Sequence, residues 1–441
     1  MRSLFTVAIV AGLSFPVTAQ ESCAVEPGCT DVGCGESLPI TDATPPWIGD
    51  LATRSALTGD WGGSRSALAE SGVTFQGNAT QFYMGVADGG LNTGFEYGGH
   101  NDYVLNFDMD KAVGLKGNFI KIRAEHRYGQ NINRATGAIL PASLASGLPV
   151  PDSEKIYLTN VLVTQFLSET FGVYFGKLDT LDGDMNAFAH GRGKDQFLNT
   201  SLAANPALLR IVPYSTLGAG VVIIPAEDSI INIGVLNATD TTRTTGFDEL
   251  FNDGAVITAE GRFKTEFLGK PGHQLIGAAW NSRDFTSLEQ DPRILFPPAG
   301  IPIARQSGSW GVYYNFDQYL VTDPCDPTKG WGVFGRFGIT DGNPNPIDWF
   351  LSFGIGGDSP IHGRDNDTWG LGWYMNAVSD ELGPVATTFL GVDDGQGVEC
   401  FYNYEVTPWF HVTSDVQYIQ PSARNRADDA FVVGLRAKID L

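Results

Sequence analysis

The chain has 441 residues, with 28 Lys and Arg against 50 Asp and Glu, and therefore a formal net charge of −22. Binding to phosphate needs a basic surface, so this balance disfavours nucleic acid as a partner. Only 18% of residues are charged, 11% are aromatic and 54 are glycine, a composition that excludes a disordered chain or a coiled coil. Length alone suggests two or three domains of about 150 residues, so the strand pattern must decide between one domain and several.

Residues 1–19 are predicted to be a cleaved secretory signal peptide. Arg2 supplies the positive start, Leu4 to Phe15 are mostly apolar, and Val17-Thr18-Ala19 offers a small-residue cleavage site. A membrane anchor is the alternative, but about twelve apolar residues are too few to cross roughly 30 Å of hydrocarbon. We therefore expect an exported protein that begins near Gln20.

The cysteines form an N-terminal group, Cys23, Cys29 and Cys34, and a distant pair, Cys325 and Cys400. Export permits disulfides, and one bridge within the group and a Cys325 to Cys400 bridge both fit the spacing. Zinc is the weaker alternative, because the group contains no CxxC pair. An odd number of cysteines leaves at least one thiol without an internal partner.

Beyond the signal the chain shows two-residue alternation of apolar and polar side chains. At the end of the chain Phe431, Val433 and Leu435 share one face, and Arg436 and Lys438 share the other. The same rule predicts sixteen strands, which start near Val73, Asp102, Asn118, Lys155, Phe171, Leu217, Ser229, Gly254, Gly272, Ser309, Trp331, Ile347, Thr368, Val398, Pro408 and Asp429.

The predicted connections alternate in length. Long ones follow most odd-numbered strands, the first included, and short ones follow most even-numbered strands, as at residues 225–228. An even number of antiparallel strands with long loops on one rim is typical of a bacterial outer-membrane β-barrel, which closes because lipid cannot hydrogen-bond a sheet edge. We predict an all-β fold with one 16-stranded antiparallel transmembrane barrel over residues 57–441, preceded by a periplasmic segment over 20–56. Two β-sandwich domains are the soluble alternative.

Several motifs resemble the carbohydrate-selective outer-membrane porins. They are Leu57-Thr58-Gly59-Asp60-Trp61-Gly62-Gly63-Ser64-Arg65, Gly176-Lys177-Leu178-Asp179, Phe188-Ala189-His190-Gly191-Arg192-Gly193, Gly363-Arg364-Asp365-Asn366-Asp367 and Thr407-Pro408-Trp409. The resemblance implies a short helix near 60–71, a barrel from about Val73, and facilitated diffusion of sugars such as glucose. The chain departs from the family in its 21–50 segment and in ending with Leu441 rather than an aromatic residue.

A sugar-selective pore needs charged hydrogen-bonding groups and aromatic platforms. On the third strand Lys121, Arg123, Glu125 and Arg127 share the polar face, which we assign to the lumen. Direct contact with sugar is one interpretation of this row, and pairing across strands in a wet interior is the other.

The segment from Asp179 to Thr216 follows the fifth strand, and the loop at this place folds into the pore of general porins. By that analogy Asp184, Arg192 and Lys194 border the constriction. Arg336 and Trp409 complete the predicted pore-lining set. No catalytic residue, metal ligand or cofactor is predicted, because the six histidines are scattered and no HExxH or nucleophile elbow occurs.

We predict an outer-membrane porin for facilitated diffusion of carbohydrates, monosaccharides such as glucose. A general or cation-preferring porin is the first alternative, and a structural or adhesion barrel that transports nothing is the second. The predicted partners are a carbohydrate solute, outer-membrane lipid and the barrel assembly machinery. The protein is expected to act as a monomer or a homotrimer.

Overall fold

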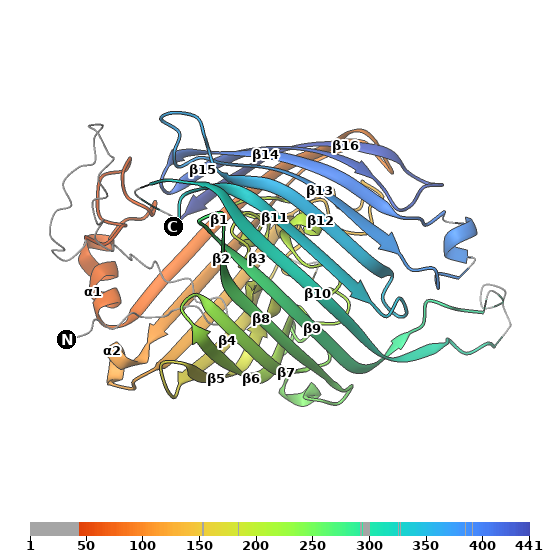
Figure 1. Ribbon diagram of the computed structural model, residues 1–441, viewed down its shortest axis with the longest axis horizontal. Helices are drawn as coiled ribbons and strands as arrows, with labels where there is room; N and C mark the ends of the chain where they lie inside the picture. The colour runs from red at the N-terminus through yellow and green to blue at the C-terminus, as the bar shows by residue number, and fades with distance from the viewer. Residues whose placement is uncertain are drawn as a thin grey trace.

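The computed structural model describes residues 44–151, 154–183, 185–291, 293, 300–324, 326, 328–383, 385–389 and 391–441. Sixteen antiparallel strands form one closed barrel, in which β1 also pairs with β16 (Figure 1). The strands are β1 (Val73–Gly90), β2 (Gly94–Asp108), β3 (Asn118–Gly129), β4 (Ile156–Phe166), β5 (Phe171–Asp179), β6 (Ser215–Ala226), β7 (Ser229–Asn237), β8 (Ala255–Phe267), β9 (Lys270–Thr286), β10 (Arg305–Thr322), β11 (Gly330–Thr340), β12 (Ile347–Asp358), β13 (Thr368–Val378), β14 (Gly395–Thr407), β15 (Phe410–Gln420) and β16 (Asp428–Asp440). The predicted fold class is confirmed.

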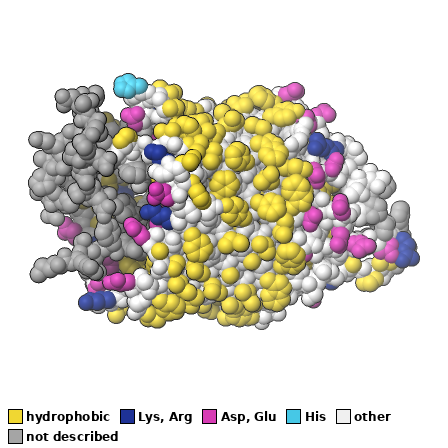
Figure 2. Space-filling model, in the orientation of Figure 1, with side chains coloured by type: hydrophobic (Ala, Val, Ile, Leu, Met, Phe, Trp, Pro, Cys, Tyr) yellow, Lys and Arg dark blue, Asp and Glu magenta, His cyan; other side chains and the backbone are white. Residues whose placement is uncertain are grey.

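Alternation along each strand separates an apolar outer face from a polar inner face. On β16, Phe431 and Leu435 are 42% and 53% exposed, whereas the side chain of Arg436 is buried inside the barrel. Figure 2 shows the result on the visible face, an apolar belt with charged side chains gathered towards both ends. Such a belt is the surface that lipid requires. None of the helices in the described ranges is long and apolar enough to cross a membrane.

The two rims of the barrel differ. Short connections such as 227–228, 268–269 and 408–409 lie on one rim, and long connections such as 130–155 and 180–214 lie on the other. The described N-terminal residues and the C-terminus lie together on the short-turn rim (Figure 1).

The first connection is an exception to the predicted pattern of long loops. It spans only residues 91–93, because β2 begins at Gly94 rather than near Asp102 and pairs with β1 as far as Val86. Residues 94–97 are all exposed. Met84 and Val86, which lie opposite on β1, are buried, so it is the β2 strand alone that shows no alternation of burial at this point.

A short helix precedes the barrel, as predicted. The 3₁₀ turn η1 (Trp61–Gly63) leads into α1 (Ser64–Glu70), and the Asp60 carboxylate accepts a hydrogen bond from the Ser66 backbone N–H at 2.9 Å. Arg65 donates to the carbonyl oxygens of Leu441 and Phe75 at 3.1 and 3.0 Å, so this helix is held at the junction of β1 and β16. The other helical turns are α2 (Met109–Val113), η2 (Ala145–Gly147), η3 (Thr180–Gly183), η4 (Gly191–Gly193), α3 (Thr200–Ala203), η5 (Phe247–Glu249) and the π-helical turn η7 (Val385–Phe389).

Some predictions fall on residues outside the described ranges. These are the signal peptide, the cysteine group from Cys23 to Cys34, Cys325 and Asp184. Cys400 is exposed on β14 and is bonded to no described cysteine.

Candidate functional site in the barrel lumen

Residues 180–214, here called the inner loop, connect β5 to β6 and fold into the barrel. Phe197 in this loop is fully buried, with its ring centroid 5.3 Å from that of Phe334 on β11 and 4.9 Å from that of Phe401 on β14. Leu202 belongs to the same buried cluster. The inner loop is therefore packed across the lumen against the far wall.

Inward-pointing charges from the barrel wall hold the backbone of the inner loop. Arg436 on β16 is buried and donates to the carbonyl oxygens of Gly193 and Gln196 at 2.9 and 2.7 Å. A buried guanidinium is stable only when its donors are satisfied. The loop carbonyls supply the acceptors that Arg436 needs, and Arg436 in turn fixes the position of the loop backbone.

Two further wall residues act in the same way. Glu399 on β14 accepts hydrogen bonds from the consecutive backbone N–H groups of 198–199, at 2.5 and 2.9 Å. Arg336 on β11 donates to the carbonyl oxygens of Ala189 and Leu202. The inner loop is thus anchored to three strands on the side of the barrel opposite its own attachment.

A second loop is held by the third strand. Arg127 on β3 donates to the carbonyl oxygens of Gly147 and Pro151, both at 3.0 Å. Its role in the structure is to fix the 130–155 connection.

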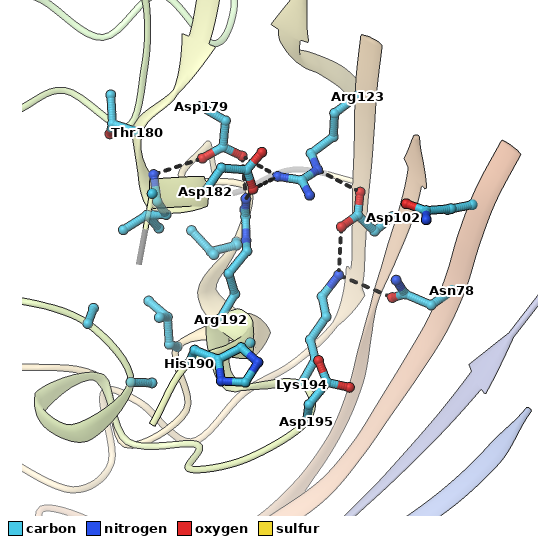
Figure 3. Close-up of a pocket in the computed structure, with 18 of the residues that line it drawn as sticks. Asn78, Asp102, Arg123, Asp179, Thr180, Asp182, His190, Arg192, Lys194 and Asp195 are labelled. Carbon is cyan, nitrogen blue, oxygen red and sulfur yellow. Dashed lines mark hydrogen bonds and ion pairs between the residues drawn. The ribbon is translucent and has the colours of Figure 1, made fainter. Parts of the chain in front are cut away.

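Charged side chains gather between the inner loop and the wall formed by β2, β3 and β5 (Figure 3). We call this set the luminal charge cluster; its members are Asp102, Lys121, Arg123, Glu125, Asp179, Asp182, Arg192 and Lys194. Four cations and four carboxylates give a formal charge of 4 − 4 = 0 for these described residues.

Arg192 lies at the centre of the luminal charge cluster. Its guanidinium approaches Glu125 at 2.7 Å and Asp182 at 3.0 Å, and it also donates to Asp179. The Tyr214 hydroxyl accepts from the same guanidinium at 3.0 Å and donates to Glu125. Arg192 therefore joins β3, β5 and the inner loop.

A second guanidinium lies beside it. Arg123 approaches Asp102 at 3.1 Å and Asp179 at 3.3 Å, and it also pairs with Asp182. The two arginines share two carboxylates, which offsets the repulsion between their like charges.

Two lysines complete the network. Lys194 donates to Asp102 and to the amide oxygen of Asn78, both at 3.1 Å, and Lys121 lies 2.7 Å from Asp182. Each cation of the luminal charge cluster therefore faces at least one carboxylate.

Burial and neighbouring charges shift the ionisation of the inner-loop members. Burial disfavours the charge on Arg192, but Asp179 and Glu125 outweigh it and hold the pKa of Arg192 well above its ordinary value. Burial lowers the pKa of Lys194 despite the nearby Asp102. Burial, then Asp179 and Glu125, raise the pKa of Tyr214 well above its usual range, so its hydroxyl stays protonated and available as a donor.

The luminal charge cluster borders a cavity of about 1290 Å³. The lining includes Trp47 and Arg65 at the short-turn rim and Arg123, Arg192 and Lys194 further in. The cavity is larger than the roughly 300–1000 Å³ of typical small-molecule pockets.

The structure separates the predicted site residues into groups. Lys121, Arg123, Glu125, Arg192 and Lys194 all belong to the luminal charge cluster.

The other predicted residues lie apart from it. Arg127 and Arg336 hold loop backbone, and Arg336 also lines the cavity. Trp409 lies in the β14–β15 turn, where its indole N–H donates to the Leu51 carbonyl at 2.7 Å.

Sequence reasoning did not single out Asp102 or Tyr214. Asp102 is the register partner of Glu125 across β2 and β3, so a predicted hairpin register could have placed it beside the β3 charges. Tyr214 reaches the luminal charge cluster through the path of the inner loop, for which the sequence holds no periodic signal.

A closed barrel with an apolar outer belt and a lumen lined by charged side chains defines an outer-membrane channel. The chain belongs to the carbohydrate-selective porin, OprB family, whose family model matches residues 92–441. It is a sugar porin, a channel of the Gram-negative outer membrane. In barrels of this kind the short turns face the periplasm.

Individual proteins are similar to this chain in sequence or in fold. Porin B of Pseudomonas aeruginosa strain PAO1 is 22% identical over 416 residues, which cover 86% of this chain and 90% of the relative. The high-pH structure of Pseudomonas putida OprB has a TM-score of 0.76 at 20% identity and covers 88% of this chain and 98% of its own. The low-pH structure of the same protein has a TM-score of 0.56 at 15% identity and covers 88% and 99%.

Proposed function

We propose that this porin carries small neutral sugars, monosaccharides such as glucose, by facilitated diffusion, and that the luminal charge cluster is where the sugar exchanges water for protein hydrogen bonds. The observation that carries the proposal is the meeting of Arg123 and Arg192 with shared carboxylates on the wall of the cavity. Donors and acceptors lie side by side there, which is the pattern that a row of sugar hydroxyls matches.

Hydroxyl groups suit this arrangement better than ions do. A hydroxyl donates one hydrogen bond and accepts two, so it bridges a carboxylate and a guanidinium without separating them. An ion carries net charge, and the described members of the luminal charge cluster sum to zero, so neither cations nor anions gain a net attraction there. This reasoning favours neutral polyhydroxylated solutes over the cation-preferring alternative.

The test is single-channel conductance of the refolded protein in a planar bilayer, titrated with glucose and then with glycerol. We expect concentration-dependent block of the ion current by glucose at concentrations where glycerol has little effect. An ion current that neither glucose nor glycerol blocks would show that the protein is a general porin. An absence of conductance would instead support a structural or adhesion role.

The remaining sequence predictions belong to the same proposal. Residues 1–19 are removed on export, 20–56 lie in the periplasm, and 57–441 form the single barrel domain that the barrel assembly machinery inserts. Mass spectrometry of the mature protein tests the cleavage near Gln20, and cross-linking in native membranes decides between a monomer and a homotrimer.

A further inference from the structure

Three charged side chains outside the luminal charge cluster line the same cavity. Asp195 belongs to the inner loop, and Lys438 and Asp440 lie on β16. The Lys438 Nζ atom lies 2.6 Å from Asp195 Oδ1 and 3.4 Å from Asp440 Oδ1. We call these three residues the Lys438 triad. Two carboxylates share one ammonium group in it, so its formal charge is 1 − 2 = −1.

The Lys438 triad adjoins the luminal charge cluster through neighbouring strands. Asp440 on β16 pairs in register with Asn78 on β1, and Asn78 pairs with Asp102 on β2. Register partners on adjacent strands lie about 5 Å apart between their Cα atoms. Lys194, which precedes Asp195 in the inner loop, reaches both Asn78 and Asp102 (Figure 3). The two sets of charges are therefore neighbours on one wall of the cavity.

The Lys438 triad is more open to solvent than the luminal charge cluster. The Asp195 and Asp440 side chains are 43% and 29% exposed. Arg123 and Arg192, the most exposed members of the luminal charge cluster, are each 10% exposed. Because Asp195 and Asp440 line the cavity, a solute inside it contacts these two carboxylates directly.

Each carboxylate keeps one oxygen for a solute. Among the described residues, Lys438 pairs with the Oδ1 atoms of Asp195 and Asp440, and neither Oδ2 atom has a hydrogen-bond partner. Burial would raise the pKa of Asp195, but Lys438 lowers it to about 2. The Asp195 carboxylate is therefore ionised at neutral pH, and its oxygens accept hydrogen bonds.

The ammonium group of Lys438 makes this site suit hydroxyls better than cations. Its charge already offsets half of the negative charge of the two carboxylates, and it repels any cation that approaches them. A hydroxyl donates to an Oδ2 atom without displacing Lys438. Lys438 also has three N–H donors and only two carboxylates to satisfy, so one donor is left for a solute oxygen.

We propose that the Lys438 triad is a second hydroxyl-binding subsite for the permeating sugar, in which Asp195 and Asp440 accept hydrogen bonds from sugar hydroxyls and Lys438 donates one. Such bonds to charged groups are stronger than bonds between neutral groups. The inference deepens the proposed function and rests on it, because the same sugar passes both sets of charges. The subsite offers two acceptors beside one donor, a pattern that several adjacent hydroxyls of one sugar match.

The test is block of the ion current by glucose in planar bilayers, for the wild type and the double variant D195N/D440N. Each substitution keeps the size of the side chain and removes its negative charge. We expect the concentration of glucose for half-block to rise roughly three- to tenfold, the value of a hydrogen bond to a charged group. Asp195→Glu keeps a carboxylate, so glucose should block this variant more strongly than Asp195→Asn.

Asp291→Asn is the matched control. Asp291 is 31% exposed and paired with Arg293, but it lies in the β9–β10 connection and does not line the cavity. This variant should keep the wild-type glucose block. The size limit for polyethylene glycols, measured on D195N/D440N as well, reports whether the inner loop has stayed in place.

Three results would overturn the subsite. The first is an unchanged glucose block in D195N/D440N, even if the ratio of K⁺ to Cl⁻ permeability falls, because the carboxylates would then act on ions alone. The second is an equal loss of block in D291N. The third is a weaker block accompanied by a larger polyethylene glycol limit, because the Lys438 triad would then only hold the loop. All three leave the proposed function standing, whereas an absence of glucose block in the wild-type channel would overturn both.

Discussion

Arg192 combines an unusual backbone conformation with hydrogen bonds to four side chains in the lumen. Its φ of +56° lies in the left-handed region, which residues other than glycine rarely adopt. The surrounding carboxylates of Glu125, Asp179 and Asp182 hold the side chain in place. Local backbone strain of this kind persists where the environment over-determines the conformation, and it is frequent at functional sites.

We predict that Arg192→Ala weakens glucose block about tenfold, in line with the loss of a charge-assisted hydrogen bond of about 1.5 kcal/mol. The same change leaves the described luminal charge cluster with a formal charge of −1, so the preference for K⁺ over Cl⁻ should rise. Planar-bilayer titration and reversal potentials measure both effects. Arg192→Lys keeps the charge and should restore ion selectivity without restoring full block. Unaltered glucose block in R192A would show that the sugar does not contact this side chain.

A second prediction concerns Asp228 in the turn between β6 and β7. Burial would raise the pKa of Asp228, but hydrogen bonds from His273 and the Arg262 guanidinium lower it to about 2. An unfolded Asp titrates near pH 3.9, so the stabilisation is complete above about pH 4 and is lost as pH falls through about 2.

Asp228→Asn removes the charge and keeps the backbone conformation, because φ at Asp228 is +51° and Asn tolerates that conformation well. We expect the wild type to unfold at a higher temperature than D228N at pH 6, and the difference to vanish near pH 2. Heat-modifiability on gels in detergent measures the transition. A difference that persisted at pH 2 would mean that packing, not ionisation, distinguishes the two proteins.

Among the elements, the inner loop depends most on contacts distant in sequence. Its own turns are short: η3, η4 and α3 contain 4, 3 and 4 residues. Such lengths are too small to be stable alone. The loop is ordered instead by buried apolar residues and by the wall charges Arg336, Glu399 and Arg436.

We predict that Arg436→Ala loosens the inner loop. The substitution removes the donors for Gly193 and Gln196, each worth about 1.5–3 kcal/mol when the donor is charged. Open-channel current noise should rise, and larger polyethylene glycols should enter the pore. Arg293→Ala, an exposed residue paired with Asp291 in the β9–β10 connection, is the control and should leave both readouts unchanged. An unchanged size limit in R436A would show that apolar packing alone positions the loop.

The sequence predicted the strands that contact lipid and, by analogy with general porins, a pore loop between Asp179 and Thr216, but it did not predict the contacts that hold this loop. The start predicted for β3 at Asn118 and that for β12 at Ile347 coincide with the observed strands, because alternation reports which face meets hydrocarbon. Lys121, Arg123 and Glu125 were assigned to the lumen by the same signal. The anchors Glu399 and Arg436 bind a loop that lies 201 and 243 residues away in sequence. Register and loop path, which alternation does not encode, decide such contacts.

At the scale of the whole molecule, net charge and pore charge are different quantities. The full chain carries −22, whereas the described members of the luminal charge cluster sum to zero. Figure 2 places many of the acidic side chains at the two ends of the visible face. Charges there are screened within about 8 Å at physiological ionic strength.

We therefore predict weak ion selectivity in the wild-type channel. In a tenfold KCl gradient the reversal potential should be small, and the ratio of K⁺ to Cl⁻ permeability should lie close to unity. Raising the salt concentration should change it little, because screening has only a small net potential to remove. A strong cation preference that fades at high salt would instead show that the acidic ends control permeation.

The anchoring of the inner loop to three strands also has a consequence for the cell. Facilitated diffusion past this anchored loop spends no energy and imposes no direction, so influx and efflux obey the same rate constants. Net uptake is then set by whatever consumes the sugar inside, and a cell that stops metabolising it loses the gradient across this membrane within the time of free exchange. The protein therefore selects the solute, and the consumption of sugar inside the cell sets the direction of net flux.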